Sequence, residues 1–130
     1  MTRGKATGSS PYEAAYGFSR AIRVADRIFV SGTAPVEADG SSTRGDAALQ
    51  ARRCFAIILE AIEELGGSVA DVVRTRMYVV DPKDADAVGA VHGETFGEVG
   101  PAATMVVVKA LLRDEWRVEI EAEALVQRET

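Results

Sequence analysis

Residues 101–126 read PAATMVVVKALLRDEWRVEIEAEALV, and this stretch decides the fold. Two runs within it, 104–108 and 117–125, have the composition of strands and are joined by a charged turn. Along the second run, three carboxylates alternate with apolar residues: Glu119, Glu121 and Glu123. Strict alternation is typical of a strand that buries only one face. Because three like charges on one strand face repel one another, the sequence predicts that a compensating partner meets this acidic face.

The composition indicates one globular domain spanning residues 1–130. The chain is 47% hydrophobic and 27% charged, which is enough apolar material for a core and argues against intrinsic disorder. Its net charge of −5 argues against a nucleic-acid-binding surface, since domains that bind phosphates are usually basic. The only cysteine, Cys54, excludes an internal disulfide bond and cannot form a zinc site by itself.

The first ten residues, MTRGKATGSS, are polar and rich in glycine, serine and threonine. We predict a flexible arm over residues 1–10 and find in it no apolar core of a secretory signal. No run of the sequence approaches 18 consecutive apolar residues, so no membrane helix is predicted. The expected location is the cytoplasm.

Periodicity and turn signals predict the other elements. In chain order these are strands at 20–24 and 27–31, a helix at 46–65, a strand at 72–80, a helix at 84–96 and the strands at 104–108 and 117–125. The order β-β-α-β-α-β-β predicts an α+β fold with both helices on one face of the sheet.

The strand at 72–80 indicates what meets the acidic face. Every second residue belongs to its apolar side: Val73, Thr75, Met77 and Val79. Arg74, Arg76 and Tyr78 point to the other side, the one that carries the three glutamates. Complementary charge combined with an aromatic residue is typical of a subunit interface, so we expect an oligomer in which these sheet faces meet.

Four segments in fixed order carry a family resemblance: GFSRAIRVADRIFVSGTAP at 17–35, DVVRTRMYVVD at 71–81, GPAATMVVV at 100–108 and VEIEAEA at 118–124. Together they resemble the RidA/YjgF family of reactive-intermediate imine and enamine deaminases, long labelled L-PSP endoribonucleases. The resemblance covers about residues 17–126. Each segment alone is weakly specific, whereas the ordered set is specific.

The resemblance implies a chorismate-mutase-like α+β fold assembled as a homotrimer, with the sheets forming an inner barrel. Three clefts between subunits would bind the ligand, a small carboxylate-bearing metabolite. The family reaction hydrolyses 2-imino or enamine acids to 2-oxo acids and ammonia, without a metal or a bound cofactor. In this reaction an arginine binds the substrate carboxylate and a glutamate positions or activates the attacking water. No nucleic-acid or membrane partner is implied.

The family positions are only partly kept in this chain. The family glutamate falls on Glu119, with one extra residue in the turn before it. The serine–glycine pair that ends the second strand falls on Ser31 and Gly32. The cleft tyrosine is replaced by Phe18, and an asparagine of the second helix is replaced by Gly89.

The substrate-binding arginine is not kept. Its position falls on Ala103, and the position of a cysteine two residues later falls on Met105. A methyl group cannot replace the planar guanidinium fork, and a hydrogen bond to a charged group contributes about 1.5–3 kcal/mol. We therefore expect a divergent branch with altered or weak imine hydrolysis.

Two other arginines are candidates for the missing anchor. Arg76 either binds the ligand carboxylate or pairs with a glutamate at a subunit interface, and Arg20 is a second candidate near the presumed cleft. Glu119 is open to the same two interpretations, as a residue that orients water or as one member of a charge ladder. Glu121 and Glu123 are expected in such a ladder or at the surface.

Three further residues, His92, Cys54 and Trp116, are interpreted one by one. His92 is the only histidine and so the only ordinary side chain that titrates near neutrality; it is either a packing residue on its helix or a general base, and no second histidine lies at metal-binding spacing. Cys54 is predicted to be a buried, inert thiol. Trp116 either lines the cleft rim or covers the end of the barrel.

Two further functions compete with imine hydrolysis. The chain could be a non-catalytic ligand-binding or regulatory module, in which the cleft is a sensor or the oligomer a partner surface. Ribonuclease action rests on the old family label alone. A net acidic chain without a His–His or His–Lys pair is poorly suited to cleaving phosphodiesters.

Overall fold

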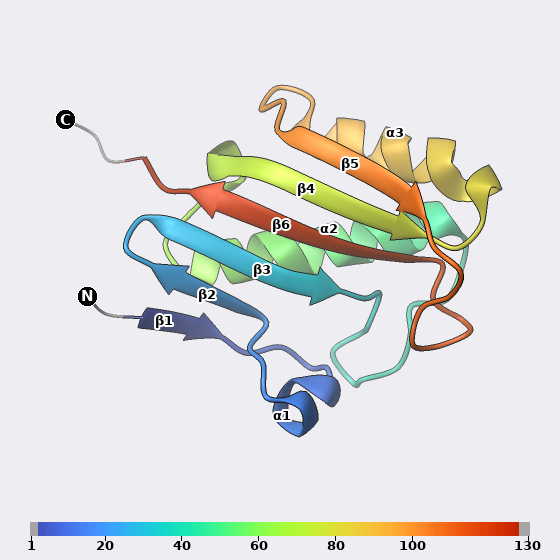
Figure 1. Cartoon of the computed structure of the whole chain (residues 1–130), viewed down its shortest axis with the longest axis horizontal. Coiled ribbons are helices and arrows are strands. Elements are labelled where there is room, and N and C mark those ends of the chain that lie inside the picture. Colours follow the sequence, from blue (N-terminus) through green and yellow to red (C-terminus); the bar gives the residue numbers. More distant parts are fainter. Residues whose placement is uncertain (1–2, 128–130) are drawn as a thin grey trace.

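The computed structural model describes residues 3–127 and forms one six-stranded sheet with its two long helices on one face (Figure 1). The elements in chain order are β1 (Arg3–Ala6), α1 (Tyr12–Tyr16), β2 (Ala21–Val24), β3 (Arg27–Thr33), α2 (Ala47–Glu64), β4 (Val72–Val79), α3 (Ala85–Phe96), β5 (Ala102–Val107) and β6 (Val118–Leu125). Short 3-10 turns precede β4 and α3. The predicted α+β class, with both helices on one face, is confirmed.

The sheet order is β1-β2-β3-β6-β4-β5. All neighbouring pairs are antiparallel except β4 and β5, which run parallel because α3 forms the crossover between them. The two strands of the 101–126 stretch are therefore not neighbours, since β4 lies between β5 and β6. The strictly alternating run becomes β6, the central strand that joins the two halves of the sheet.

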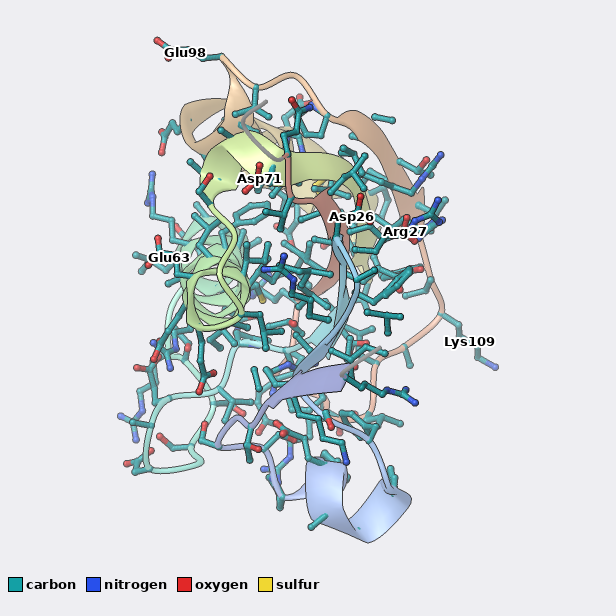
Figure 2. The ribbon with its side chains drawn as sticks, turned by 90° about the vertical axis from the view of Figure 1, so that its left-hand side faces the viewer. Asp26, Arg27, Glu63, Asp71, Glu98 and Lys109 are labelled. Atoms are coloured by element: carbon teal, nitrogen blue, oxygen red, sulfur yellow. The ribbon has the colours of Figure 1, made fainter. Side chains whose placement is uncertain are left out.

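The core lies between the sheet and the two long helices, and the side view shows α2 lying along one side of the strands (Figure 2). The apolar residues that alternate with the glutamates of β6 point into it and are at most 3% exposed: Val118, Ile120, Ala122 and Ala124. The glutamates between them face the helix-free side, as the alternation predicts. Within residues 3–127, no helix has the length and apolarity required to cross a bilayer.

Local chemistry sets the ends of α2. Asp46 caps the N-terminus, where its carboxylate accepts a hydrogen bond of 2.9 Å from the amide of Leu49. Gly66, with a φ of +88°, ends the helix in the left-handed region that favours glycine. The predicted helix at 46–65 is therefore confirmed to within a residue at each end.

The structure corrects two of the predictions. Residues 3–6 of the predicted flexible arm form β1, which pairs with β2 and buries Ala6 at 1% exposure; residues 1–2 lie outside the described part of the chain. Val73 was assigned to the buried face of its strand but is 45% exposed. A bulge between Val72 and Arg74 shifts the register there, so Val72 points inward in its place.

Candidate functional site

A pocket of about 100 Å³ lies where α1, the end of β3 and the start of β6 come together. It is smaller than the roughly 150 Å³ engineered cavity that admits benzene, so it suits a small molecule. Its lining brings together five residues singled out in the sequence: Phe18, Arg20, Gly32, Trp116 and Glu119. The other sequence candidates lie elsewhere on the chain.

Glu119 reaches the pocket across a bulge in β3. The register between β3 and β6 shifts between Val30 and Thr33, which places an extra residue on β3. A Cβ atom on Gly32 would lie 2.6 Å from Oε2 of Glu119, so only a residue without a side chain leaves room for this carboxylate. Burial raises the pKa of Glu119; the nearby Arg20 lowers it and Glu121 raises it further.

Arg20 holds the bulge in place. Its side chain is only 7% exposed, and its Nη2 donates a hydrogen bond to the carbonyl oxygen of Gly32. Burial lowers the pKa of Arg20, while the charges of Glu13 and Glu119 raise it. Its Nε atom is buried without a hydrogen-bond partner in residues 3–127. This guanidinium is enclosed and engaged, so it acts as a positioning group for Gly32 and Glu119.

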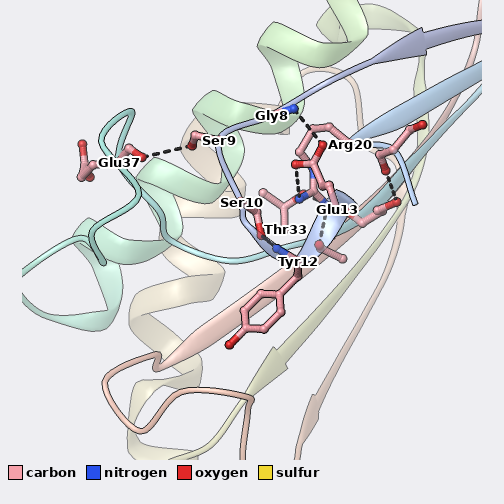
Figure 3. A network of polar contacts seen from close by, with 11 residues as sticks. Gly8, Ser9, Ser10, Tyr12, Glu13, Arg20, Thr33 and Glu37 are labelled. Atoms are coloured by element: carbon pink, nitrogen blue, oxygen red, sulfur yellow. Dashed lines mark hydrogen bonds and ion pairs between the residues drawn. The ribbon is translucent and has the colours of Figure 1, made fainter. Parts of the chain in front are cut away.

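Glu13, at the start of α1, is the partner of Arg20 and was missed in the sequence. Its Oε2 lies 3.7 Å from Nη1 of Arg20, and its Oε1 accepts a 2.9 Å hydrogen bond from the amide of Gly8 (Figure 3). The missed signal is the segment Ser10-Pro11-Tyr12-Glu13. A serine with proline directly after it and glutamate three positions after it is typical of a helix start. Recognising α1 would have placed a carboxylate near Arg20.

Aromatic rings form one wall of the pocket. Tyr12 and Tyr16 stack with centroids 5.2 Å apart, and the Trp116 ring meets Tyr12 edge-on at 6.3 Å. Nε1 of Trp116 donates a 2.9 Å hydrogen bond to the hydroxyl of Ser42. Trp116 thus lines this pocket of its own chain.

Gln50 of α2 fixes the chain just before β6. Its amide nitrogen donates to the carbonyl oxygen of Glu115 at 2.9 Å, and its amide oxygen accepts from the backbone of Arg117 at 2.7 Å. Gln50 is 3% exposed, so both bonds are shielded from water. The positions of Trp116 and Glu119 therefore depend on a buried side chain of a different element.

Ser31 does not line the pocket. It lines a neighbouring shallow hollow on the surface, to which Phe18 also contributes. Its hydroxyl donates a 2.8 Å hydrogen bond to the carbonyl oxygen of Ser19. Within this chain Ser31 therefore stabilises the turn into β2 and does not face Glu119.

Arg76 lies on the helix-free face of the sheet, in a ladder with two glutamates. Its Nη1 is 3.4 Å from Glu123 and 3.8 Å from Glu121. The Tyr78 hydroxyl donates a hydrogen bond to Glu121, and this bond raises the pKa of Tyr78. The predicted charge ladder is confirmed for Arg76, whereas Arg74 makes no ion pair among the described residues.

Ala103 and Met105 lie on β5, the edge strand beyond β4, and are absent from the pocket lining of their own chain. Ala103 pairs with Thr75, and Met105 packs toward Gly89 on α3. Neither residue therefore contributes to the Glu119 pocket of its own chain.

His92 and Cys54 are packing residues. Nε2 of His92 lies 2.7 Å from the Thr75 hydroxyl, and its ring contacts Phe55 and Phe96. Burial lowers the pKa of His92 and raises that of the fully buried Cys54 thiol. Nowhere in residues 3–127 do three histidine, cysteine, aspartate or glutamate side chains come together in a way that could hold a metal ion.

The arrangement suits proton transfer to and from a small molecule. A carboxyl group with a raised pKa can act as both base and acid closer to neutrality. The aromatic wall can hold a planar or apolar group against it. The buried guanidinium of Arg20 adds positive charge near the Glu119 carboxylate, which limits how far the pKa of Glu119 rises.

Comparison with known proteins identifies the family. The family model described as Endoribonuclease L-PSP matches residues 7–126. A Streptomyces coelicolor protein is 37% identical over 115 residues, covering 88% of this chain and 86% of that protein. The 2-iminobutanoate/2-iminopropanoate deaminase of Escherichia coli is 32% identical over 132 residues, covering 98% and 99%.

A solved structure agrees with these sequences. Rv2704 of Mycobacterium tuberculosis, described as a member of the YjgF/YER057c/UK114 family, superimposes with a TM-score of 0.88 at 38% identity. The match covers 96% of this chain and 100% of that one. The resemblance found in the sequence is thereby confirmed, and the chain belongs to the endoribonuclease L-PSP family, also called YjgF or RidA.

Proposed function

We propose that this protein hydrolyses a small imine or enamine to a carbonyl compound and ammonia, with Glu119 as the catalytic residue. The observation that carries the proposal is the Glu119 carboxyl group in its pocket, with a raised pKa and with Gly32 leaving space for it. The similarity to the Escherichia coli imine deaminase supports this reaction class.

The reaction uses Glu119 first as a base and then as an acid. Glu119 takes a proton from water while the water oxygen bonds to the imine carbon, and the electron pair of the C=N bond moves to nitrogen, which takes up a proton from solvent. The Glu119 carboxyl then returns its proton to the amine of this carbinolamine. The C–N bond breaks, ammonia leaves, and the hydroxyl loses its proton to solvent as the C=O bond forms.

The substrate differs from that of the family archetype. The methyl group of Ala103 provides no hydrogen bond for a carboxylate on the reacting carbon, where the family resemblance implies an arginine. We therefore expect 2-imino acids to be poor substrates of this protein. The same substitution favours the second candidate function, a ligand-binding module without turnover.

Turnover of two kinds of imine tests the proposal: 2-imino acids generated by an amino-acid oxidase, and imines without a carboxylate on the reacting carbon, generated by an amine oxidase. Release of the carbonyl product is followed for 2-iminopropanoate and for longer and aromatic imines of both kinds, with wild-type protein and with Glu119→Gln. The matched control is Glu94→Gln, which removes a carboxylate at the α2–α3 surface, where its side chain is 62% exposed. We expect acceleration by wild type and by the control, and loss of about 10²–10⁴-fold in Glu119→Gln, the usual contribution of a general acid–base.

Two results would contradict this assignment. If no imine is hydrolysed faster by the protein than in buffer, while small ligands still bind, the binding-module function takes its place. If 2-iminopropanoate is hydrolysed as fast as by an arginine-bearing relative, the expected divergence at Ala103 is wrong.

The proposed assembly is a homotrimer joined through the helix-free face of the sheet. That face carries exposed apolar side chains, with Phe29 at 39% and Val106 at 43% exposure, beside the Arg76 ladder. Sedimentation velocity should give three times the 13.8 kDa chain mass. Arg76→Glu places a third negative charge beside Glu121 and Glu123 and should shift the trimer towards monomer; a wild-type monomer would exclude the assembly.

A further inference from the structure

The proposed function leaves a question about substrate binding: which group holds the anionic end of the ligand when Ala103 cannot. We propose that Arg113, on the loop between β5 and β6, is the specificity-determining residue that binds a carboxylate of the ligand at the mouth of the Glu119 pocket. This inference rests on the proposed function for the identity of the pocket. It makes a prediction about binding that can be measured without turnover.

The two arginines that the sequence offers as anchors, Arg20 and Arg76, are engaged. Arg20 is buried against Glu13 and donates to the backbone of Gly32, so a ligand would have to break the pair that holds the bulge. Arg76 lies within 4 Å of two carboxylates on the sheet face, and none of its contacts is to a residue of the pocket lining. Neither guanidinium is free to turn towards a ligand beside Glu119.

Arg113 is placed differently, because aromatic rings of the pocket wall hold it. Its guanidinium carbon lies 5.8 Å from the centre of the Trp116 ring and 6.0 Å from that of Tyr12, and both rings line the pocket. Such cation–π contacts hold the guanidinium beside the two rings. Its N–H groups donate no hydrogen bond among the described residues, so they are available for a bidentate carboxylate.

The single ion pair of Arg113 within residues 3–127 is weak. Its Nη1 lies 3.8 Å from Glu115, beyond hydrogen-bonding distance, and the two side chains are 39% and 54% exposed. Oε2 of Glu115 in turn accepts a 2.9 Å hydrogen bond from the Ser42 hydroxyl, so this carboxylate keeps a partner without Arg113. A ligand carboxylate can therefore take the place of Glu115 at little cost.

The charges of the site define the ligand class. A cation already covers the aromatic rings of Tyr12 and Trp116, so these rings do not offer a cation–π site to a cationic ligand, whereas Arg113 offers a charge partner to an anionic one. Glu119 at the same pocket repels an anion, so the carboxylate belongs at the Arg113 side. The geometry fits a small planar imine or enamine with a carboxylate at one end.

Carboxylates and their neutral amides, which have nearly the same shape, test this assignment. We would titrate benzoate against benzamide, and butanoate against butanamide, following the fluorescence of Trp116, the only tryptophan in the chain. Ligand-observed NMR gives an independent readout that does not depend on the environment of the tryptophan. In wild type we expect the carboxylate of at least one pair to bind about 10- to 100-fold more tightly than its amide, as expected for charge-assisted hydrogen bonds.

Three variants decide whether Arg113 is responsible. Arg113→Gln should abolish the preference for carboxylate, and Arg113→Lys should retain a smaller preference, because lysine keeps the charge without the planar fork. The matched control is Arg117→Gln, which removes an exposed arginine nearby in the chain that pairs with Asp84 at 3.3 Å; it should bind like wild type. Equal binding of acid and amide by wild type, or an unchanged preference in Arg113→Gln, overturns the proposal.

The binding test of Arg113 and the turnover test of the proposed function can succeed or fail independently. Glu119→Gln should lose turnover and keep the preference for carboxylate, because Arg113 is intact. If imine hydrolysis fails but the preference depends on Arg113, the anchor stands and the enzyme assignment falls. If hydrolysis is confirmed and the preference is absent, the anchor alone is wrong.

Discussion

Two clusters in this molecule each combine one arginine with two glutamates, and they differ in exposure. In the pocket, Arg20 lies beside Glu13 and Glu119, and the Arg20 and Glu13 side chains are 7% and 6% exposed. On the helix-free face, Arg76 lies beside Glu121 and Glu123, with side chains 31–38% exposed. The residue types are the same, and β6 contributes to both clusters.

The difference shows that burial changes how strongly the same residue types interact. The open cluster is a charge ladder whose pairs are screened by water and salt. In the enclosed cluster the charges interact more strongly and cost more to separate, and the pKa of Glu119 is raised by burial. The raised pKa of this carboxyl group therefore follows from the burial of its position, and the sequence VEIEAEA alone does not distinguish Glu119 from Glu121.

The largest expected effect comes from breaking the enclosed cluster. Glu13→Ala leaves Arg20 buried without its nearest carboxylate and removes the acceptor of the Gly8 amide. We expect the free energy of unfolding to fall by about 3–5 kcal/mol, the usual cost of removing one partner of a buried ion pair. Urea denaturation at a fixed protomer concentration measures it.

The matched control is an open pair of helices α2 and α3. Arg52 and Glu94 lie 3.4 Å apart with 52% and 62% of their side chains exposed, so Glu94→Ala should change stability by about 1 kcal/mol or less. The double variant Glu13→Leu with Arg20→Met removes both buried charges and should be more stable than Glu13→Ala. A cost below about 1 kcal/mol for Glu13→Ala would show that the two clusters are equivalent.

The second effect separates activity from stability at the bulge. In Gly32→Ala, the new Cβ would lie 2.6 Å from Oε2 of Glu119, so the carboxylate must move. Because the displaced atom ends a flexible side chain, the cost in stability should stay within about 1 kcal/mol. Imine turnover should fall by about 10–100-fold, since displacement of a catalytic group by about 1 Å costs that much.

A glycine in α3 provides the comparison for Gly32. Gly93 has no heavy atom within 4 Å of an added Cβ, so Gly93→Ala should gain up to about 1 kcal/mol from helix propensity and keep full activity. Thermal unfolding measures the change in stability and steady-state turnover measures the activity, on the same samples of each variant. Unchanged turnover in Gly32→Ala would show that the position of Glu119 does not matter for the reaction.

The sequence predicted the strands and helices well because their signals are local. Period-two alternation in β6, the cap at Asp46 and the glycine after α2 are read within a few residues, and each fits the structure. The short elements β1 and α1 were missed. Four strand residues and one helical turn carry too little periodicity, and Ala6 is buried only because β2 and α2 happen to cover it.

The candidate site was predicted less well, because it depends on contacts between distant segments. Family positions led to Glu119 and Gly32, but the partner of Arg20 lies in α1, and Arg113 is oriented by a tyrosine about 100 positions earlier in the chain. Ala103 and Met105 lie on a strand that does not reach the pocket of the same chain. Their family positions therefore did not lead to residues of this pocket.

The smallest effect is the pH dependence that follows from the raised pKa of Glu119. The folded state keeps the Glu119 proton at pH values where the unfolded chain, with its ordinary pKa of 4.5, has lost it. The contribution of this group to stability is therefore present below pH 4.5 and is lost as the pH rises through the raised pKa. Glu119→Gln should remove this loss and unfold at a higher urea concentration than wild type at neutral pH.

Glu115 is the comparison, because its pKa is shifted in the opposite direction. Hydrogen bonds from its own backbone amide and from Ser42 lower the pKa of Glu115, so Glu115→Gln should instead lose stability relative to wild type above pH 4.5. Parallel urea titrations between pH 4 and 8 compare the two variants, and a Glu119→Gln profile parallel to that of wild type would mean that the carboxyl group is as open to water as those of the ladder.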